Sequence, residues 1–344
     1  MFCYGNFYRE KETMKMCRVA VIAVFLLGLI CPGAIWSMEI ALGVVTKPGA
    51  AQNVCAEKFR ELVGARLPHK VRIYDSGSLG TEAEILKKIQ KGSIHMGIIT
   101  SGPFDRFVPG ARVIDYPYLF GNYEQVDRVL EGPMGQKLLR MLEKAGFKGL
   151  AFSENGFRHL TNSRRPVHGV EDVAGLKIRV MESDLHRELW RLFGADPIPI
   201  GDLKKLIAGL QSKEIDGQEN PLSAIWLDDF YKGQRYLSLT GHVYSSHIGV
   251  AGLKWFKGLP QKDQKAIVQC MEQAARYQRR WSRDNEAGFL EKIKAAGIIV
   301  DEKPDIASFR KKASGIEELG IFQAKDVRKL LLEFKKAVAG TGRK

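Results

Sequence analysis

The sequence predicts an α/β protein with two domains, and three observations support this prediction. Segments with the two-residue apolar period of strands alternate along the chain with segments of helical period. About 307 of the 344 residues remain after a predicted leader of 37 residues, which is enough for two separate cores. A proline-free stretch, 261–303, carries apolar residues at helical spacing and predicts one unusually long helix.

The first half of the chain predicts strands and helices around a largely parallel sheet. Strand patterns cover 40–44, 71–74 and 94–99, and a helical pattern around 59–63 separates the first two. A glycine-rich turn at 76–80 follows the second strand. This alternation is typical of α/β layers.

The helix before the third strand has the clearest boundaries. Thr81 and Glu84 have the spacing of a capping box, in which each side chain bonds the other residue's backbone N–H. The apolar stripe of 85–89 comes next, and Gly92 ends the segment. We therefore expect a helix that begins after Thr81 and ends before Gly92.

The second half repeats this style. Residues 176–180 predict a strand with apolar residues on one face and charged residues, Arg179 among them, on the other. Helical patterns cover 184–194 and 203–210. The polar sequence Asp-Gly-Gln-Glu-Asn-Pro at 216–221 predicts a turn.

The N-terminus has the pattern of a signal peptide. Basic residues up to Arg18 precede the apolar run 19–30, and we expect cleavage after Ser37. A run of about 12 apolar residues is too short for a membrane span, which needs about 20. Cys31 could instead serve as a lipid-attachment site, although the large Ile30 before it disfavours that processing. The mature chain is therefore expected to be an exported, soluble protein.

The chain is strongly basic, with a formal net charge of +14. Removal of 1–37 takes away four basic and two acidic residues, so the mature protein keeps a charge of +12. Basic pairs are scattered along the chain rather than gathered as in a nucleic-acid groove, at Lys87-Lys88, Arg164-Arg165, Lys204-Lys205 and Lys335-Lys336. We expect no nucleic-acid partner and consider small anions the natural ligands of an exported basic protein.

Common catalytic and redox signatures are absent from the sequence. We find no HExxH, CxxC, GxGxxG, P-loop or GxSxG motif, and the histidines show no metal-ligand spacing. Only Cys55 and Cys270 follow the leader, and two distant cysteines form no disulfide framework. We therefore expect buried free thiols, no cofactor, no bound metal and no enzymatic activity.

Several ordered motifs resemble one family, the solute-binding proteins of tripartite ATP-independent periplasmic (TRAP) transporters, dicarboxylate (DctP) type. The motifs are GSLG at 77–80, DYPYLF at 115–120, GFRHLTN at 156–162, RPV at 165–167, DVAGLKIRV at 172–180, FGADPIP at 193–199, Leu210-Gln211 and DGQENP at 216–221. The resemblance covers nearly all of the mature chain.

This resemblance implies a two-lobed periplasmic binding protein fold with a ligand cleft and a long bridging helix. Lobe I would contain 38–155 plus 245–284, and lobe II would contain 156–244 plus 285–344. The implied function is capture of a small organic carboxylate in the periplasm and its delivery to TRAP transporter membrane subunits. The protein would act as a monomer. C4-dicarboxylates, sugar acids, keto acids, sialic acid and ectoine-like compounds all occur as ligands in the family, so the resemblance leaves the ligand open.

The resemblance also implies a set of ligand-binding residues. Arg179 would form a salt bridge with the ligand carboxylate, and Asn220 would assist in binding it. Arg158 and His242 would lie in the cleft, and Thr100 and Ser101 would lie where lobe I meets the ligand. An arginine suits the first role because its planar, permanently charged fork matches a carboxylate. Loops 46–53 and 100–107 are expected to form the rest of the cleft.

Each of these residues also has an explanation that needs no ligand. Arg179 could be an exposed strand residue, Arg158 could form a salt bridge with Glu154 or Glu182, and Asn220 could serve a turn. Ordinary structural roles would equally explain the other three. Two other functions stay open at this point: a periplasmic ligand-sensing component for a signalling receptor, and an enzyme that kept the binding fold.

Overall fold

The computed structural model describes residues 37–340, so the predicted leader, apart from Ser37, lies outside the described residues. The strands are β1 (Glu39–Gly43), β2 (Lys70–Tyr74), β3 (Met96–Thr100), β4 (Phe147–Phe157), β5 (His159–Asn162), β6 (Lys177–Val180), β7 (Asp196–Pro199), β8 (Gly217–Asn220), β9 (Tyr236–Ser238), β10 (Tyr244–Gly252) and β11 (Ile299–Asp301). The helices are α2 (Ala51–Arg66), α3 (Glu82–Lys91), α4 (Tyr123–Leu130), α5 (Pro133–Met141), α6 (Asp184–Leu192), α7 (Leu203–Ser212), α8 (Leu222–Leu227), α9 (Leu253–Gly258), α10 (Gln261–Ala295), α11 (Ile306–Ala313) and α12 (Lys325–Ala339). Short 3-10 helices connect them, at η1 (Gly102–Arg106), η2 (Pro109–Val113), η3 (Leu142–Ala145), η4 (Val170–Val173), η5 (Ser314–Glu318) and η6 (Gly320–Phe322).

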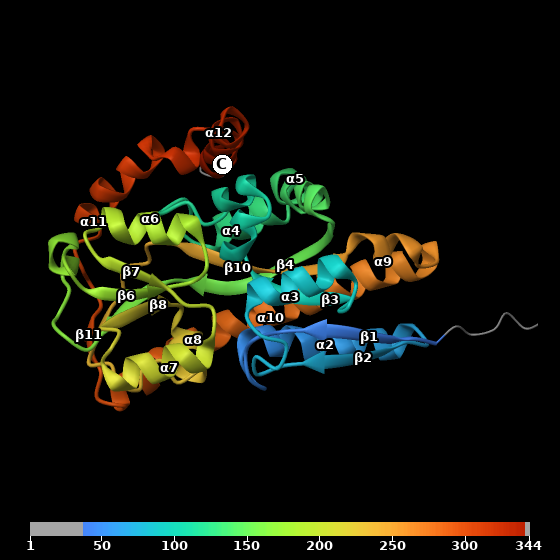
Figure 1. Ribbon diagram of the computed structural model, residues 1–344, viewed down its shortest axis with the longest axis horizontal. Helices are drawn as coiled ribbons and strands as arrows, with labels where there is room; N and C mark the ends of the chain where they lie inside the picture. Colours follow the sequence, from blue (N-terminus) through green and yellow to red (C-terminus); the bar gives the residue numbers. More distant parts are fainter. Residues whose placement is uncertain (1–36, 341–344) are drawn as a thin grey trace, which may run out of the picture. The chain divides into compact units, whose positions relative to one another are not determined.

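The strands form two mixed sheets, each belonging to one lobe (Figure 1). The first sheet has the order β2-β1-β3-β10-β4, with β1 parallel to β2 and β3 and with β10 antiparallel to β3 and β4. The second has the order β11-β9-β5-β8-β6-β7, in which β5 runs antiparallel to β8 and β9. The α/β class is confirmed, but the prediction of a largely parallel sheet is only partly right, because returning strands pair antiparallel in both sheets.

Local sequence signals set the helix boundaries as expected in α3. The Thr81 hydroxyl accepts from the Glu84 N–H, and the Glu84 carboxylate accepts from the Thr81 N–H, so the capping box is complete. Gly92 ends the helix with a positive φ of 78°. Because a side chain is strained in that conformation, glycine is favoured at this position.

The turn predicted at 216–221 is wrong, because residues 217–220 form the strand β8 inside the second sheet. All four residues of β8 are buried although three of them are polar. A Cβ on Gly217 would lie 2.2 Å from the Thr161 carbonyl oxygen, so the close approach of β5 and β8 requires a glycine there. Glycine and polar residues therefore mark a tightly packed strand here.

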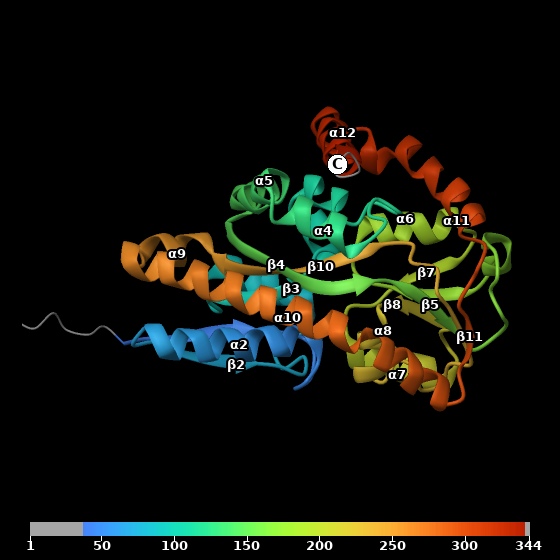
Figure 2. The same ribbon diagram turned by 180° about the vertical axis from the view of Figure 1, so that it is seen from behind.

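The predicted long helix is α10, which spans 35 residues (Figure 2). It ends at Ala295 rather than near residue 303, because Gly297 takes a positive φ and the chain continues into β11. The helix packs against α2 and β4 of the first lobe and against α8 of the second. It therefore bridges the two lobes, as the resemblance implies.

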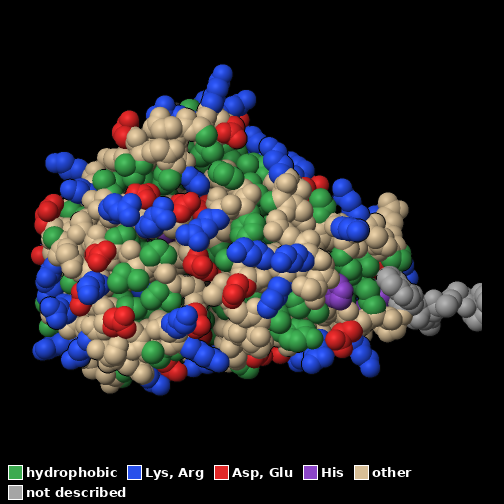
Figure 3. Space-filling view, in the orientation of Figure 1, with side chains coloured by type: hydrophobic (Ala, Val, Ile, Leu, Met, Phe, Trp, Pro, Cys, Tyr) green, Lys and Arg blue, Asp and Glu red, His purple; other side chains and the backbone are tan. Residues whose placement is uncertain are grey.

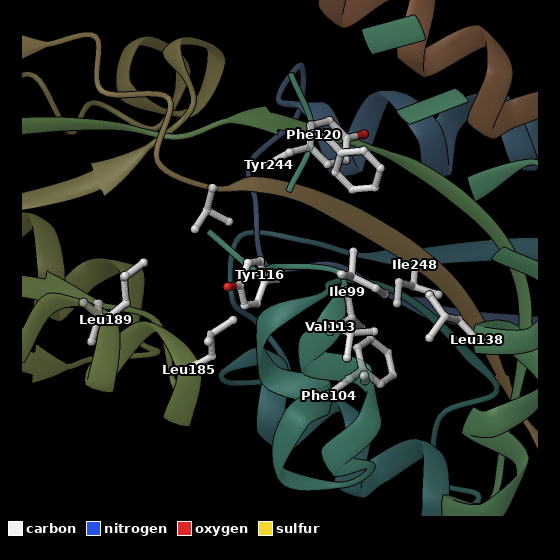
Figure 4. Close-up of a cluster of buried hydrophobic side chains, with 14 of the residues drawn as sticks. Ile99, Phe104, Val113, Tyr116, Phe120, Leu138, Leu185, Leu189, Tyr244 and Ile248 are labelled. Carbon is white, nitrogen blue, oxygen red and sulfur yellow. The ribbon is translucent and has the colours of Figure 1, made fainter. Parts of the chain in front are cut away.

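A continuous buried core joins elements of both lobes. Figure 4 shows Leu185 of α6 beside Tyr116, which follows η2, and the two belong to one cluster with Ile99 and Ile248 of the first sheet. The C-terminal segment also makes contacts across the molecule, since α12 packs against η2 and α4, and Arg112 donates to the Ile321 carbonyl. The proposed lobe boundaries stay a prediction.

The two cysteines of the described residues, Cys55 and Cys270, are buried and unbridged, as expected. Burial raises the pKa of the Cys55 thiol to about 12, so this thiol stays protonated at neutral pH. It packs as a small apolar residue and is not a reactive nucleophile.

Candidate ligand-binding site

A pocket lies where the two lobes meet, with about 540 Å³ of empty space that is partly open to solvent. One side comes from the connection between β1 and α2, the start of α3 and the end of β3. The other side comes from β6, β8 and the segment 222–230. Because both lobes contribute, a ligand bound here would contact both and favour their closure.

Four of the six predicted site residues line this pocket, namely Thr100, Arg158, Arg179 and Asn220. Ser101 and His242 are buried behind it and are not among the lining residues. The loop 46–53 contributes to the wall as expected, whereas only Thr100 of the loop 100–107 does so.

Arg179 reaches the pocket from β6 and is only 5% exposed. Its Nε donates to the Ile200 carbonyl at 2.7 Å, which orients the guanidinium plane. No ion pair joins this guanidinium to a carboxylate among residues 37–340. Burial and the neighbouring Arg158 lower the pKa of Arg179 to about 10, and Glu219 and Glu82 oppose this shift, so it stays charged at neutral pH.

Arg158, by contrast, is already paired. Its guanidinium forms a bidentate ion pair with Glu219, with Nη2 2.8 Å from Oε1, and both side chains are completely buried. The alternative of a salt bridge to Glu154 or Glu182 is wrong in its choice of partner, and Glu154 pairs instead with Arg283. Glu219 comes from β8, the segment that the sequence predicted as a turn, so the pairing was not foreseeable from local patterns.

Glu219 lies at the centre of a buried network that includes His242. The Nε2 atom of His242 is 3.0 Å from Glu219 Oε2, and Nδ1 of His186 is 3.4 Å from Oε1. The second His186 nitrogen contacts Asp115 at 3.1 Å, and Ser101 donates to the same carboxyl group. Ser101 and His242 thus hold the groups behind the pocket wall.

The charges in this network have shifted pKa values. Burial alone would raise the pKa of Glu219, but Arg158 and His186 outweigh it and hold that pKa well below its usual value. Burial alone would lower the pKa of His186, yet Glu219 and Asp115 raise it to about 9. In this network, Arg158 and His186 both contact the Glu219 carboxyl group, and His186 also contacts that of Asp115.

Thr100 supports a carboxylate that sequence reasoning missed. Its backbone N–H and hydroxyl donate to Glu82 Oε1 at 2.7 and 2.8 Å, and the Gln52 amide donates to the same oxygen at 2.6 Å. Burial raises the pKa of Glu82, and these bonds together with the charge of Arg179 oppose the rise. Glu82 was overlooked because an acidic residue in the first turn of a helix is explained by the helix dipole alone.

Asn220 ends β8 and lines the pocket. Its Nδ2 donates to Gln218 Oε1 at 2.6 Å. Asp228 is a second lining residue that the sequence gave no signal for. Burial raises the pKa of Asp228 to about 7, with Lys47 opposing and Asp229 adding to the shift.

A family model, described as bacterial extracellular solute-binding protein, family 7 (DctP), matches residues 42–318 of this chain. The chain belongs to this family. A solute-binding protein of Verminephrobacter eiseniae is 36% identical over 76% of this chain and 77% of its own length. The 2,3-diketo-L-gulonate-binding periplasmic protein of Escherichia coli is 32% identical over 86% of this chain and 91% of its own length.

Solved structures agree with the family model. A TRAP periplasmic solute-binding protein from Polaromonas sp. JS666, crystallised with D-erythronate, is 35% identical, with a TM-score of 0.80. The match covers 86% of this chain and 98% of that protein. The family and two-lobed fold implied by the motifs are therefore confirmed, and the chain is a solute-binding protein rather than an enzyme.

Two further observations concern the described residues as a whole. Within 37–340, no helix has the length and apolar character needed to cross a bilayer, and no cluster of three or more metal-ligating side chains is arranged to hold an ion. Figure 3 shows lysine and arginine side chains spread over the visible face and mixed with acidic ones.

Proposed function

We propose that this protein captures a small organic acid anion in the periplasm, through Arg179, and delivers it to the membrane subunits of a TRAP transporter. One observation carries the proposal: Arg179 lines the pocket, is oriented by the Ile200 carbonyl, and has no carboxylate partner among residues 37–340. A buried arginine without a counter-charge is costly unless an anion joins it. The ligand carboxylate would supply that charge.

The relatives support an acid as the ligand. The Escherichia coli relative is named for binding 2,3-diketo-L-gulonate, and the Polaromonas structure contains D-erythronate. Both compounds are small acids with a single carboxylate, the group that a guanidinium fork recognises. We infer the same mode of recognition here.

We assign roles to the other predicted residues on the same basis. Asn220 and Thr100 line the pocket and offer polar atoms to the ligand. Arg158 lines the pocket, but its charge is matched by Glu219. His242 and Ser101 position the buried groups behind the wall rather than contact the ligand.

The predicted signal peptide and the family support a periplasmic location for the protein and a TRAP transporter as its partner. The predicted signal peptide exports the chain, and the Escherichia coli relative is named as periplasmic. The membrane subunits of a TRAP transporter are the receiving partners, and one protomer with its own complete pocket is sufficient, so we propose a monomer. No observation favours a signalling receptor over a transporter.

A binding screen tests the proposal. The purified protein without its leader would be heated with a panel of organic acids, and a true ligand should stabilise it by about 2.7 kcal/mol at a hundredfold excess over the dissociation constant. Transport in vesicles should then require both this protein and the membrane subunits. The proposal fails if no acid raises the melting temperature.

A further inference from the structure

We propose that the pocket selects a monocarboxylate that carries hydroxyl groups and rejects dicarboxylates, with Glu82 and Asp228 as the residues that set this preference. This inference rests on the proposed function and narrows its ligand class. It follows from the charges that line the pocket and from the bonds that each of them already makes.

Four side chains with formal charges line the pocket: Arg179, Arg158, Glu82 and Asp228. The charge of Arg158 is matched by the bidentate pair with Glu219. Arg179 is therefore the one lining cation among the described residues without a carboxylate partner. It provides for a single ligand carboxylate, and a second carboxylate would find no cation left for it.

Glu82 presents an acceptor to the ligand. The three hydrogen bonds that it receives from Thr100 and Gln52 all go to Oε1. The Oε2 atom receives none of these bonds and is left for a donor in the pocket. These bonds also fix the carboxylate in place, because Gln52 is itself held by the Val45 N–H. A hydroxyl of the ligand is a suitable donor, whereas a ligand carboxylate would be repelled.

Asp228 adds a second acceptor on the opposite lobe. Its side chain lines the pocket, is 7% exposed and, within residues 37–340, takes part in no hydrogen bond or ion pair. Buried polar groups are normally bonded, so an unbonded carboxyl group facing a pocket points to a ligand that supplies the partner. The nearby Lys47 bonds Asp229 instead.

Neutral polar side chains complete the lining and favour hydroxyls over an ammonium group. Thr46, Asn155, Asn220 and Ser223 all line the pocket and match the small, two-way hydrogen bonding of alcohols. A ligand with several hydroxyls can bond many of these groups at once. An ammonium group can only donate hydrogen bonds, so it would leave the donor atoms of these neutral groups without an acceptor.

The first part of the test compares pairs of acids that differ in one group only. D-Erythronate becomes meso-tartrate, and D-galactonate becomes galactarate, when the terminal CH2OH is replaced by a carboxylate. Titration calorimetry on the protein without its leader should give tighter binding of the monocarboxylate in at least one pair, by about tenfold or more. Butyrate has the same carboxylate as D-erythronate but no hydroxyl groups, and 4-aminobutyrate has an ammonium group in place of hydroxyls. Both should bind more weakly than D-erythronate.

Two variants locate the source of this preference. Glu82→Gln and Asp228→Asn keep the shape of each side chain but remove the negative charge. The titrations are run at a pH above the raised pKa of Asp228, about 7, so that this carboxyl group is ionised in the unaltered protein. In each variant the monocarboxylate-to-dicarboxylate affinity ratio should fall by about fivefold or more. Glu84→Gln is the matched control, since it removes a carboxylate from the same helix turn, outside the pocket lining, and glutamine preserves the capping box. Its ratio should equal that of the unaltered protein.

The outcomes separate this inference from the proposed function. If in both pairs the dicarboxylate binds as tightly as its matched monocarboxylate, or if both variants keep the original ratio, the inference is overturned while acid binding stands. If 4-aminobutyrate binds most tightly of all, the pocket prefers an ammonium group to hydroxyl groups, and the inference is again overturned. If no acid of any kind binds, the proposed function itself is wrong.

Discussion

Arg158 and Glu219 form a bidentate ion pair in which both side chains are completely inaccessible to solvent. The two residues are 61 positions apart in the sequence and meet because Arg158 lies at the end of β4 and Glu219 lies in β8. This pair neutralises one of the two arginines at the pocket and leaves Arg179 for a ligand. Four predictions follow from this division of roles and from the packing around it.

The first prediction concerns the stability of the pair. Glu219→Gln should lower the free energy of unfolding by about 3–5 kcal/mol, because Arg158 and His186 would be left as buried cations without their shared counter-charge. Urea denaturation of ligand-free protein measures this. Glu291→Gln, which removes a 70% exposed partner of Lys294, should change the same quantity by less than about 1 kcal/mol. Equal effects of the two substitutions would contradict the proposed importance of burial.

The second prediction concerns ligand affinity. Arg179→Lys should weaken binding of the preferred acid by about tenfold or more, because a lysine offers a point charge in place of a planar fork. The free energy of unfolding of the ligand-free variant should fall by no more than about 1–2 kcal/mol, since only the hydrogen bond to the Ile200 carbonyl is lost. Calorimetry gives the affinity, with Arg191→Lys on the exposed side of α6 as the control. Unchanged affinity would remove Arg179 from the site.

The third prediction concerns pH. The folded-state pKa of His186 is raised from 6.5 to about 9, so its stabilisation is fully present below pH 6.5 and is lost as the pH rises through 9. The difference in unfolding free energy between the protein and His186→Gln should therefore shrink by roughly 3 kcal/mol across this window. Urea titrations at several pH values measure it.

His168→Gln is the control for this pH series. His168 also contacts an aspartate, Asp301, and its pKa is also raised, but its side chain is 69% exposed. Its substitution should leave the pH profile of stability nearly unchanged. A pH-independent difference for His186→Gln would mean that folding leaves the pKa of this histidine unchanged.

The fourth prediction concerns the close approach of β5 and β8. Gly217→Ala should destabilise the protein by about 1–3 kcal/mol or more, because the new Cβ would lie 2.2 Å from the Thr161 carbonyl oxygen. Gly258→Ala, at the end of α9 with no atom within 4 Å of the added carbon, should be neutral or slightly stabilising. Thermal unfolding of both variants compares them directly, and similar melting temperatures would show that β8 can shift to make room.

Much of the local structure was predictable because its causes lie within a few residues. The capping box of Thr81 and Glu84, the glycine end at Gly92 and the apolar repeat of α10 all depend on neighbours three or four positions away. The strand β8 was not predictable in this way. Its glycine and polar residues resemble a turn, and only pairing with β5 and β6 shows why they are buried.

Some residues of the candidate site were predictable from the sequence, and others were found only in the structure. Family motifs indicated Arg179, Asn220, Arg158 and Thr100, and all four line the pocket. The sequence could not show that Ser101 and His242 differ from these four residues. They lie behind the residues that line the pocket, and this position depends on packing between distant segments. Glu82 carried no distinct signal, since a carboxylate in the first turn of a helix has an ordinary structural explanation, and Asp228 belongs to none of the family motifs.

The sequence by itself determined the family, the α/β class, the long helix and the presence of arginines suited to an anion. Only the tertiary structure decided which arginine is available, because that depends on a counter-charge 61 residues away in the chain. It likewise decided the charge balance of the pocket, since Glu82 and Asp228 meet Arg179 there only after the two lobes have folded around it. Electrostatic partnership depends on distance and burial in space, and neither quantity can be read from the order of residues alone.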